Sequence, residues 1–191
     1  MRILGISGSP RCGGNTDVAV QAVLEELSGQ VETEFLRIAD LDIAHCMGCK
    51  ACKFSHPGRC AIVDGFQLVL RKWETADLVV IGNPVFWHTP PGVMIDFIHR
   101  LFCYYYVYLK APDDAPNPRS PVDGKKLATL AIAGATGATK VNEWIAGCLS
   151  GYGAEALGSL ELIALEIGDL AGNNEQLQIL KTFAGELLEK I

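Results

Sequence analysis

Short apolar runs and longer segments of helical period alternate along the chain. Residues 78–81 are entirely apolar, which is typical of a parallel strand buried on both faces. Residues 16–27 instead place their apolar side chains three or four positions apart, as an amphipathic helix does. The pattern predicts five strands, at residues 3–6, 31–38, 78–81, 127–133 and 157–165. It also predicts five helices, at residues 16–27, 66–73, 93–108, 141–149 and 175–189.

This alternation predicts an α/β fold, an open and doubly wound parallel sheet with a layer of helices on each face. In such sheets ligands bind beyond the carboxyl ends of the strands. Three turns fall there, at residues 7–16, 83–89 and 134–139. No repeat or linker divides the chain, so we expect one domain over residues 1–191, with a proline-rich surface loop at 111–121.

The composition is globular, with 49% hydrophobic and 20% charged residues. The 16 basic and 22 acidic side chains give a formal net charge of −6, which argues against a general nucleic-acid binder. No apolar run approaches the ~18–20 residues of a membrane span. The first residues turn polar too early for a signal peptide. We therefore expect a cytoplasmic protein that binds neither nucleic acid nor membrane.

The turn at residues 7–16 is rich in glycine and hydroxyl groups and opens a helix, whose N-terminus is a natural phosphate site. It lacks the G-x-G-x-x-G spacing of dinucleotide sites, and Gly14 stands where a P-loop needs lysine. Val18 stands where a phosphatase loop beginning at Cys12 needs arginine. A monophosphate cradle remains, or an ordinary turn capped by Asn15 or Thr16. The candidate ligands of the cradle are Ser7, Ser9, Asn15 and Thr16 as donors and Arg11 as a cation.

The second and third turns have compositions that suit a flat ring. The second contains two aromatic residues and three prolines, although local packing of Phe86 and Trp87 explains it equally well. The third consists of small residues, which either admit a planar ligand to the backbone or form a flexible connector. The candidate residues are Asn83, Pro84, Val85, Phe86, Trp87 and His88 in the second turn and Ala135, Thr136 and Gly137 in the third.

Four of the seven cysteines, Cys46, Cys49, Cys52 and Cys60, follow the spacing Cys-x2-Cys-x2-Cys-x7-Cys. This spacing is typical of iron–sulfur ligation. Zinc, a Cys-x2-Cys redox pair and four unligated thiols are the alternatives. Residues 45–60 contain three basic side chains and no acid, which favours an anionic cluster.

Several of these segments resemble a known family. Residues 5–11 (GISGSPR) and 14–16 (GNT) resemble the opening of the NADPH-dependent FMN reductase and multimeric flavodoxin superfamily. Residues 82–86 (GNPVF) resemble its second flavin loop, and residues 97–100 (FIHR) the helix end that follows. The cysteines are similar to the compact motif of the iron–sulfur flavoproteins within that superfamily. The resemblance implies a flavodoxin-like fold, bound FMN, a 4Fe–4S cluster and a homodimer or homotetramer.

The resemblance also implies roles for the candidate residues. The first turn would hold the FMN phosphate, and the backbone of residues 84–88 would contact the ring edge, with Phe86 or Trp87 against one face. Residues 135–138 would close the pyrimidine side. We expect the cysteine loop to emerge at the same edge of the sheet as these turns, close to the FMN of the same or a neighbouring subunit.

The implied function is that of a flavin-dependent oxidoreductase that passes electrons between the cluster and FMN. A ferredoxin-like one-electron donor and NAD(P)H are candidate partners. Two alternatives stay open: an NAD(P)H-dependent FMN or quinone reductase without a cluster, and a non-catalytic, flavodoxin-like electron carrier. The aromatic stretch at residues 102–108 indicates an interface between copies, since aromatic residues are enriched there.

Overall fold

A computed structural model describes residues 1–108 and 120–191, and it contains a five-stranded, all-parallel sheet in the order β2-β1-β3-β4-β5. The strands are β1 (Arg2–Ser7), β2 (Glu32–Arg37), β3 (Leu78–Pro84), β4 (Lys126–Ala133) and β5 (Glu155–Ile163). This order is that of the flavodoxin fold, with the chain reversing direction across the sheet between β1 and β3. The predicted fold class is therefore confirmed.

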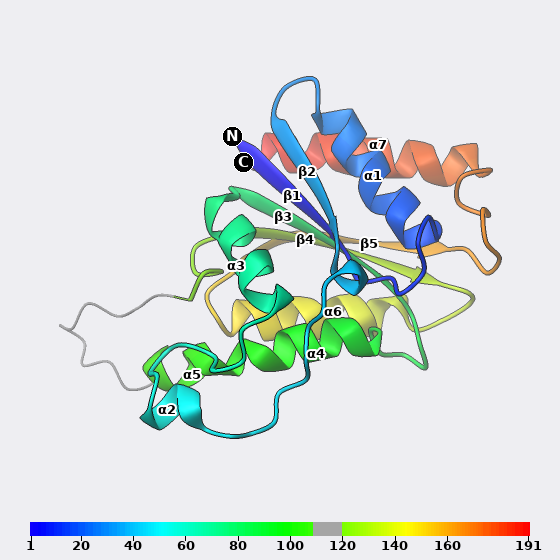
Figure 1. The fold of residues 1–191 in the computed structure, drawn as a ribbon. Helices are drawn as coiled ribbons and strands as arrows, with labels where there is room; N and C mark the ends of the chain where they lie inside the picture. Colours follow the sequence, from blue (N-terminus) through cyan, green and yellow to red (C-terminus); the bar gives the residue numbers. More distant parts are fainter. Residues whose placement is uncertain (109–119) are drawn as a thin grey trace.

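Helices cover both faces of the sheet, as Figure 1 shows: α1 and α7 lie on one face, and α3, α4 and α6 on the other. The helices are α1 (Asn15–Leu27), α2 (Ala51–Phe54), α3 (Gly65–Thr75), α4 (Gly92–Arg100), α5 (Phe102–Tyr108), α6 (Ala138–Ser150) and α7 (Asn174–Glu189), with a 3-10 turn η1 at Ile38–Asp40. None of the helices in the described ranges is long and apolar enough to cross a membrane.

The expected helix at residues 93–108 is divided into α4 and α5, which meet at the fully buried Leu101. The apolar period runs through this point, so the spacing does not mark the division. The sequence pattern also predicts that the fifth strand ends at Leu165. In the structure β5 ends at Ile163, and Leu165 is exposed. The expected proline-rich loop lies almost entirely outside the described residues.

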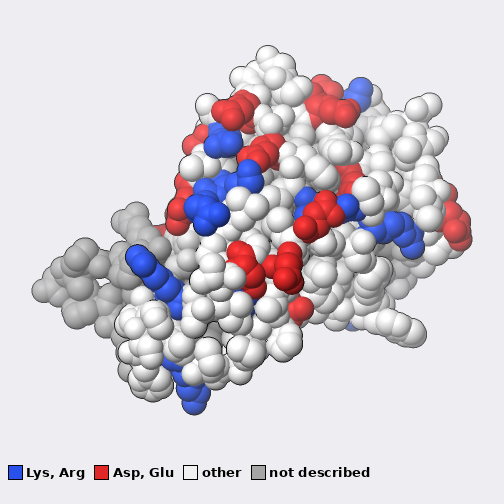
Figure 2. Space-filling view, viewed as in Figure 1, with Lys and Arg blue, Asp and Glu red and all other residues white. Residues whose placement is uncertain are grey.

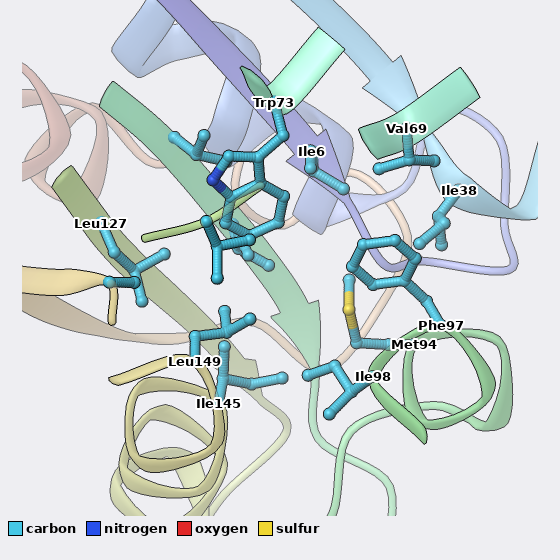
Figure 3. Close-up of a cluster of buried hydrophobic side chains, with 14 of the residues drawn as sticks. Ile6, Ile38, Val69, Trp73, Met94, Phe97, Ile98, Leu127, Ile145 and Leu149 are labelled. Carbon is cyan, nitrogen blue, oxygen red and sulfur yellow. The ribbon is translucent and has the colours of Figure 1, made fainter. Parts of the chain in front are cut away.

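Each face of the sheet has its own hydrophobic core. On the α3, α4 and α6 face, Trp73 stacks on Phe97 with ring centroids 6.2 Å apart (Figure 3). Phe66 packs on the same ring at 5.6 Å. On the other face, α1 and α7 pack their apolar sides against β1, β3 and β4. Strands buried on both sides explain why the central runs are continuously apolar.

Two glycines allow α1 to approach the sheet closely. A Cβ on Gly5 of β1 would lie 2.6 Å from side-chain carbons of both Val20 and Leu24. A Cβ on Gly82 of β3 would lie 2.5 Å from Val20 Cγ2 and 3.0 Å from Thr16 Cγ2. Because Thr16 is in the first turn of α1, Gly82 sets the position of that helix's N-terminus.

We predict that Gly82→Ala destabilises the protein by about 1–3 kcal/mol, because the new methyl group overpacks the contact between α1 and β3. The free energy of unfolding in urea measures this. Gly147→Ala is the matched control, since nothing lies within 4 Å of a Cβ at that position in α6. The control should be stabilising by about 0.5–1 kcal/mol. Equal effects of the two changes would contradict the close approach.

A buried ion pair ties the segment between β2 and α3 to the end of α4. The Arg100 side chain is fully buried, and its Nη1 lies 2.6 Å from Asp64 Oδ2. The guanidinium also donates to the carbonyls of Ala44 (3.0 Å) and Ile62 (2.9 Å). Asp64 in turn caps α3 by accepting from the Phe66 N–H. One arginine therefore anchors both ends of the cysteine-containing segment.

We predict that Asp64→Asn costs about 3 kcal/mol of unfolding free energy near neutral pH, because Arg100 loses its buried counter-charge. Burial alone would raise the pKa of Asp64, but the Arg100 guanidinium and the N–H groups of Phe66 and Ala44 hold that pKa below its ordinary value. The carboxylate's contribution is complete above the unfolded pKa of about 3.9 and is lost as the pH falls through the lower folded pKa.

The difference between wild type and Asp64→Asn should therefore shrink as the pH falls below about 4. Unfolding curves at a series of pH values measure it. Asp40→Asn is the control, because Asp40 pairs with Arg37 at the surface, where such pairs contribute about 1 kcal/mol or less. A difference that does not change with pH would contradict the assignment.

Candidate functional site

A pocket of about 300 Å³ opens at the carboxyl edge of the sheet, where the chain direction reverses between β1 and β3. Four segments line it, namely Ser9–Arg11 and Gly14–Thr16 from the first turn, Pro84–Phe86 from the second, Ile132 and Gly134 at the end of β4, and Ala164 and Leu165 after β5. No acidic side chain lines this pocket among the described residues, and Arg11 is its charged group. The pocket therefore suits an anion.

The first turn is held in shape by Asp17, which the sequence analysis did not single out. This carboxylate is almost fully buried, accepts from the Ser7 hydroxyl at 2.5 Å and accepts from the Gly13 N–H at 2.7 Å. Arg37 of β2 lies 4.0 Å from it. Ser7 is thus buried outside the pocket lining, and its hydroxyl donates to Asp17. From the sequence we expect this hydroxyl to donate to a phosphate instead. The sequence feature that indicates this role is the position of Asp17, an acid in the first turn of α1.

Asn15 also has a partner that the sequence did not indicate. Its Nδ2 donates to the Glu166 carbonyl at 2.8 Å, and its Oδ1 accepts from the Leu170 N–H at 3.2 Å. The side-chain amide therefore fastens the loop after β5 to the start of α1, and that loop forms one wall of the pocket. The carboxyl-end rule for parallel strands applies to β5 as well, but the overlong expected strand concealed this fourth segment.

Ser9, Arg11 and Thr16 line the pocket as expected, each in a different setting. The Ser9 hydroxyl bonds with the backbone of Arg11, which tightens the turn. Arg11 is exposed, and Thr16 is buried in the first turn of α1. Gly14 precedes α1 without a side-chain cap, so neither Asn15 nor Thr16 caps it. The first N–H groups of any α-helix lack intrahelical partners and can bind an anion.

The second turn is strained at its tip. Phe86 and Thr89 exchange two backbone hydrogen bonds of 2.9 and 3.0 Å, and the two residues between them have positive φ angles, 51° at Trp87 and 64° at His88. Bulky residues rarely adopt this region, and such strain clusters at functional sites. Phe86 lines the pocket, whereas the Trp87 side chain is 97% exposed beyond it.

His88 joins the second turn to the third. Its ring lies over Gly137, where a Cβ would be 2.7 Å from His88 Cδ2. His88 Nε2 is 3.3 Å from the Thr136 hydroxyl, and Nδ1 is 3.4 Å from Lys140 Nζ. Ala135, Thr136 and Gly137 do not line the pocket, which Gly134 reaches instead. The third turn therefore acts on the pocket by supporting the second.

Gly8 of the first turn and Asn83 of the second are in close contact. A Cβ on Gly8 would be 2.1 Å from Asn83 Oδ1, so only glycine fits here. The Asn83 side chain is buried, and its Oδ1 lacks a hydrogen-bond partner within the described part of the chain. Asn83 therefore packs the second turn against the first.

The four motif cysteines line a second cavity, of about 240 Å³, together with Arg100, Phe102 and Cys103. Cys46 and Cys49 are exposed, and Cys52 and Cys60 are half-buried. Lys50, between them, has a φ of 58°, which curls the segment around the cavity. Over the described ranges, no three potential ligands already stand at metal-binding positions. The thiols face one cavity without forming a closed coordination site.

The chemistry of this cavity fits an anionic metal cluster. Arg100 Nε is buried and has no hydrogen-bond partner among the described residues. Burial lowers the pKa of Arg100, but the hydrogen bond that Arg100 donates to Asp64 and the charge interaction with nearby Cys60 raise it overall. Burial raises the pKa of Cys52, and the neighbouring thiolates of Cys60, Cys49 and Cys46 raise it further. Metal ions bound between the sulfur atoms would reduce the repulsion among these thiolates. On the face seen in Figure 2, the end of the molecule at α2 shows basic side chains and no acidic ones.

The cysteine cavity and the pocket lie at opposite ends of α4, contrary to the expectation of a shared sheet edge. Pro84–Phe86 precede α4, whereas Arg100 is its last residue. Nine helical residues span about 13 Å. The reason is that α4 returns from the carboxyl edge of the sheet, and Arg100 then holds the cysteine segment at the far end (Figure 1).

Comparison with known proteins agrees with this arrangement. The model of a family described as NADPH-dependent FMN reductase matches residues 1–163. An iron-sulfur flavoprotein of Methanocaldococcus jannaschii is 40% identical over 88 residues, which are 46% of this chain and 45% of that protein. The chain thus spans about half the length of the curated relatives it matches.

Solved structures share the fold. A flavone reductase superposes with a TM-score of 0.69 at 21% identity, covering 96% of this chain and 60% of the other. A flavodoxin from the domain Archaea superposes with a TM-score of 0.62 at 14% identity, covering 100% of this chain and 98% of the other. Since the family model matches most of the chain, including the three turns and the cysteine segment, the chain belongs to the NADPH-dependent FMN reductase family.

Proposed function

We propose that this protein is an FMN-dependent oxidoreductase in which FMN binds at the carboxyl-edge pocket. The observation that carries the proposal is a pocket that lies against the N-terminus of α1 and beside Arg11 and that no acidic side chain of the described residues lines. When bound, FMN supplies hydride and single-electron transfer chemistry. The family to which the chain belongs supports the choice of FMN.

Different residues of the chain would bind the phosphate of FMN, hold the first turn in shape and border the ring. The first N–H groups of α1, with Thr16, Ser9 and Arg11, would bind the phosphate, and Ser7 and Asn15 would hold the turn through Asp17 and the loop after β5. Pro84–Phe86 and Leu165 would border the ring. The distance between the turns would be fixed by Asn83, His88, Ala135, Thr136 and Gly137. The exposed Trp87 side chain would lie beside the open side of the ring.

We predict one FMN per chain, and no FAD, because the site we propose in the first turn would hold a single phosphate and lacks the dinucleotide spacing. Chromatography of the flavin released from the purified or reconstituted protein identifies it. Arg11→Ala should weaken FMN binding about tenfold, as the loss of one charge-assisted hydrogen bond would. Arg71→Ala, an exposed arginine of α3, is the control and should bind FMN normally. FAD, or equal binding by both variants, would refute this phosphate site.

We further propose that Cys46, Cys49, Cys52 and Cys60 hold a 4Fe–4S cluster and that electrons pass between this cluster and FMN. Support comes from the spacing, the shared cavity, the buried Arg100 and the absence of acids between residues 45 and 60. The curated relatives that match are iron-sulfur flavoproteins. A one-electron donor such as ferredoxin fits this role better than NAD(P)H.

The length of α4 between the two sites leads us to propose that the protein works as a homodimer or homotetramer. A second copy could place its pocket nearer to the cysteine cavity than the chain's own pocket is. An apolar groove of about 680 Å³ lies beside that cavity. Phe102 and Tyr105 are partly exposed in it, with ring centroids 5.2 Å apart.

We predict that anaerobically purified protein contains four iron atoms per chain, as the 4Fe–4S proposal requires. The double variant Cys49→Ser/Cys52→Ser should lose the iron, keep FMN, and show slower FMN reduction by reduced ferredoxin. Iron analysis, the visible spectrum and stopped-flow rates measure these properties. Cys148→Ser, a half-buried cysteine on α6, is the control and should keep both cofactors.

The rates also separate the alternatives. If wild type and the iron-free variant reduce FMN equally fast, the cluster is not on the electron path, and an NAD(P)H-dependent FMN or quinone reductase becomes the better description. If the protein oxidises no NAD(P)H and reduces no small acceptor, a non-catalytic electron carrier becomes the better description.

A further inference from the structure

The cysteine cavity contains a fifth thiol that the sequence motif does not include. Cys103 is only 2% exposed, and it lines the same cavity as Cys46, Cys49, Cys52 and Cys60. It belongs to α5, which lies against the short helix α2 that carries Cys52 (Figure 1). More than forty residues separate Cys103 from Cys60, so their spacing gives no sign that they meet.

Cys60 and Cys52 are the motif cysteines that pack against the buried core cluster to which Cys103 belongs. Cys103 is also the most deeply buried of the five thiols, since Cys46 and Cys49 are exposed and Cys52 and Cys60 half-buried. The four motif thiols are therefore the more accessible ligands, and Cys103 lies on the buried side of the cavity.

A separate feature shows that this side of the cavity is built for an anionic sulfur. The Arg100 side chain is fully buried and lines the cavity, and its Nε has no partner within the described ranges. Its positive charge favours the ionised form of Cys103. A metal ion bound here would add to that effect, because thiolates and not thiols bind metals.

We propose that Cys103 is a reserve ligand of the cluster site, which can replace Cys60. This inference rests on the proposed cluster. In the exchange, the iron–Sγ bond to Cys60 breaks as an iron–Sγ bond to Cys103 forms, and the thiol proton of Cys103 passes through water to the Cys60 thiolate. Where Cys60 is replaced by alanine, the proton passes to water. No electron is gained or lost, so the exchange needs no further reactant.

The test compares iron and labile sulfide contents after anaerobic reconstitution of four proteins with Fe²⁺ and sulfide. These are wild type, Cys60→Ala, Cys103→Ala and the double variant Cys60→Ala/Cys103→Ala. Each single variant should keep the iron content of wild type, because four thiolates remain in either. The electron paramagnetic resonance spectrum of the reduced Cys60→Ala variant should shift, since one ligand has changed. The double variant should lose most of its iron.

Two further variants serve as controls. Cys60→Ala/Cys148→Ala should behave like Cys60→Ala, because Cys148 does not line the cavity. Cys49→Ala should lose iron although Cys103 is present, because Cys49 is exposed, whereas Cys60 packs against the buried cluster that contains Cys103. Bound FMN and the unfolding midpoint of each variant establish that the chain is folded.

The outcomes separate the inference from the proposal beneath it. If folded Cys60→Ala loses as much iron as the double variant, or if the double variant keeps its iron, Cys103 is not the reserve ligand. If wild type itself binds no iron, the proposed cluster fails, and the reserve ligand fails with it.

Discussion

The burial of both faces of an all-parallel sheet is the constraint on which the rest of this structure depends. The three central strands, β1, β3 and β4, are buried on both faces, and parallel pairing requires each connection to cross over and leave a turn at the carboxyl edge. Gly5 and Gly82 allow α1 to come close enough to cover β1 and β3 and thereby place its N-terminus at that edge. The phosphate site we propose is thus a consequence of how the core closes.

Arg100 has the same importance for the opposite end of α4. A buried guanidinium is costly unless its charge is balanced and its hydrogen bonds are made. Asp64 and two carbonyls meet most of that need, and they fix both ends of the cysteine segment in doing so. Arg100 also lines the cysteine cavity, and its buried Nε has no hydrogen-bond partner among the described residues. The interaction that holds the segment in place is therefore also the one that makes its cavity suitable for an anionic cluster.

The second turn of the pocket departs from local rules of stability at three positions. Trp87 and His88 have positive φ angles, and the buried Oδ1 of Asn83 has no partner among the described residues. These departures lie within six consecutive residues. Elsewhere in the described chain, Lys50 has a positive φ angle, and single buried polar atoms of Trp73, Arg100, Thr129 and Asn142 lack a partner. Proteins tend to retain such departures at functional sites and to compensate elsewhere. The contacts of His88 with Thr136 and Lys140 are one such compensation.

The sequence by itself determined the fold class, the turns at the carboxyl edge and the four-cysteine motif, because each depends on spacing within a short stretch of chain. Only the tertiary structure decided the roles of Ser7 and Asn15, since their partners Asp17, Glu166 and Leu170 are chosen by how the loops pack. It alone brought Cys103 to the cysteine cavity and separated that cavity from the pocket. Contacts between residues far apart in the chain have no fixed spacing, so no local sequence pattern predicts them.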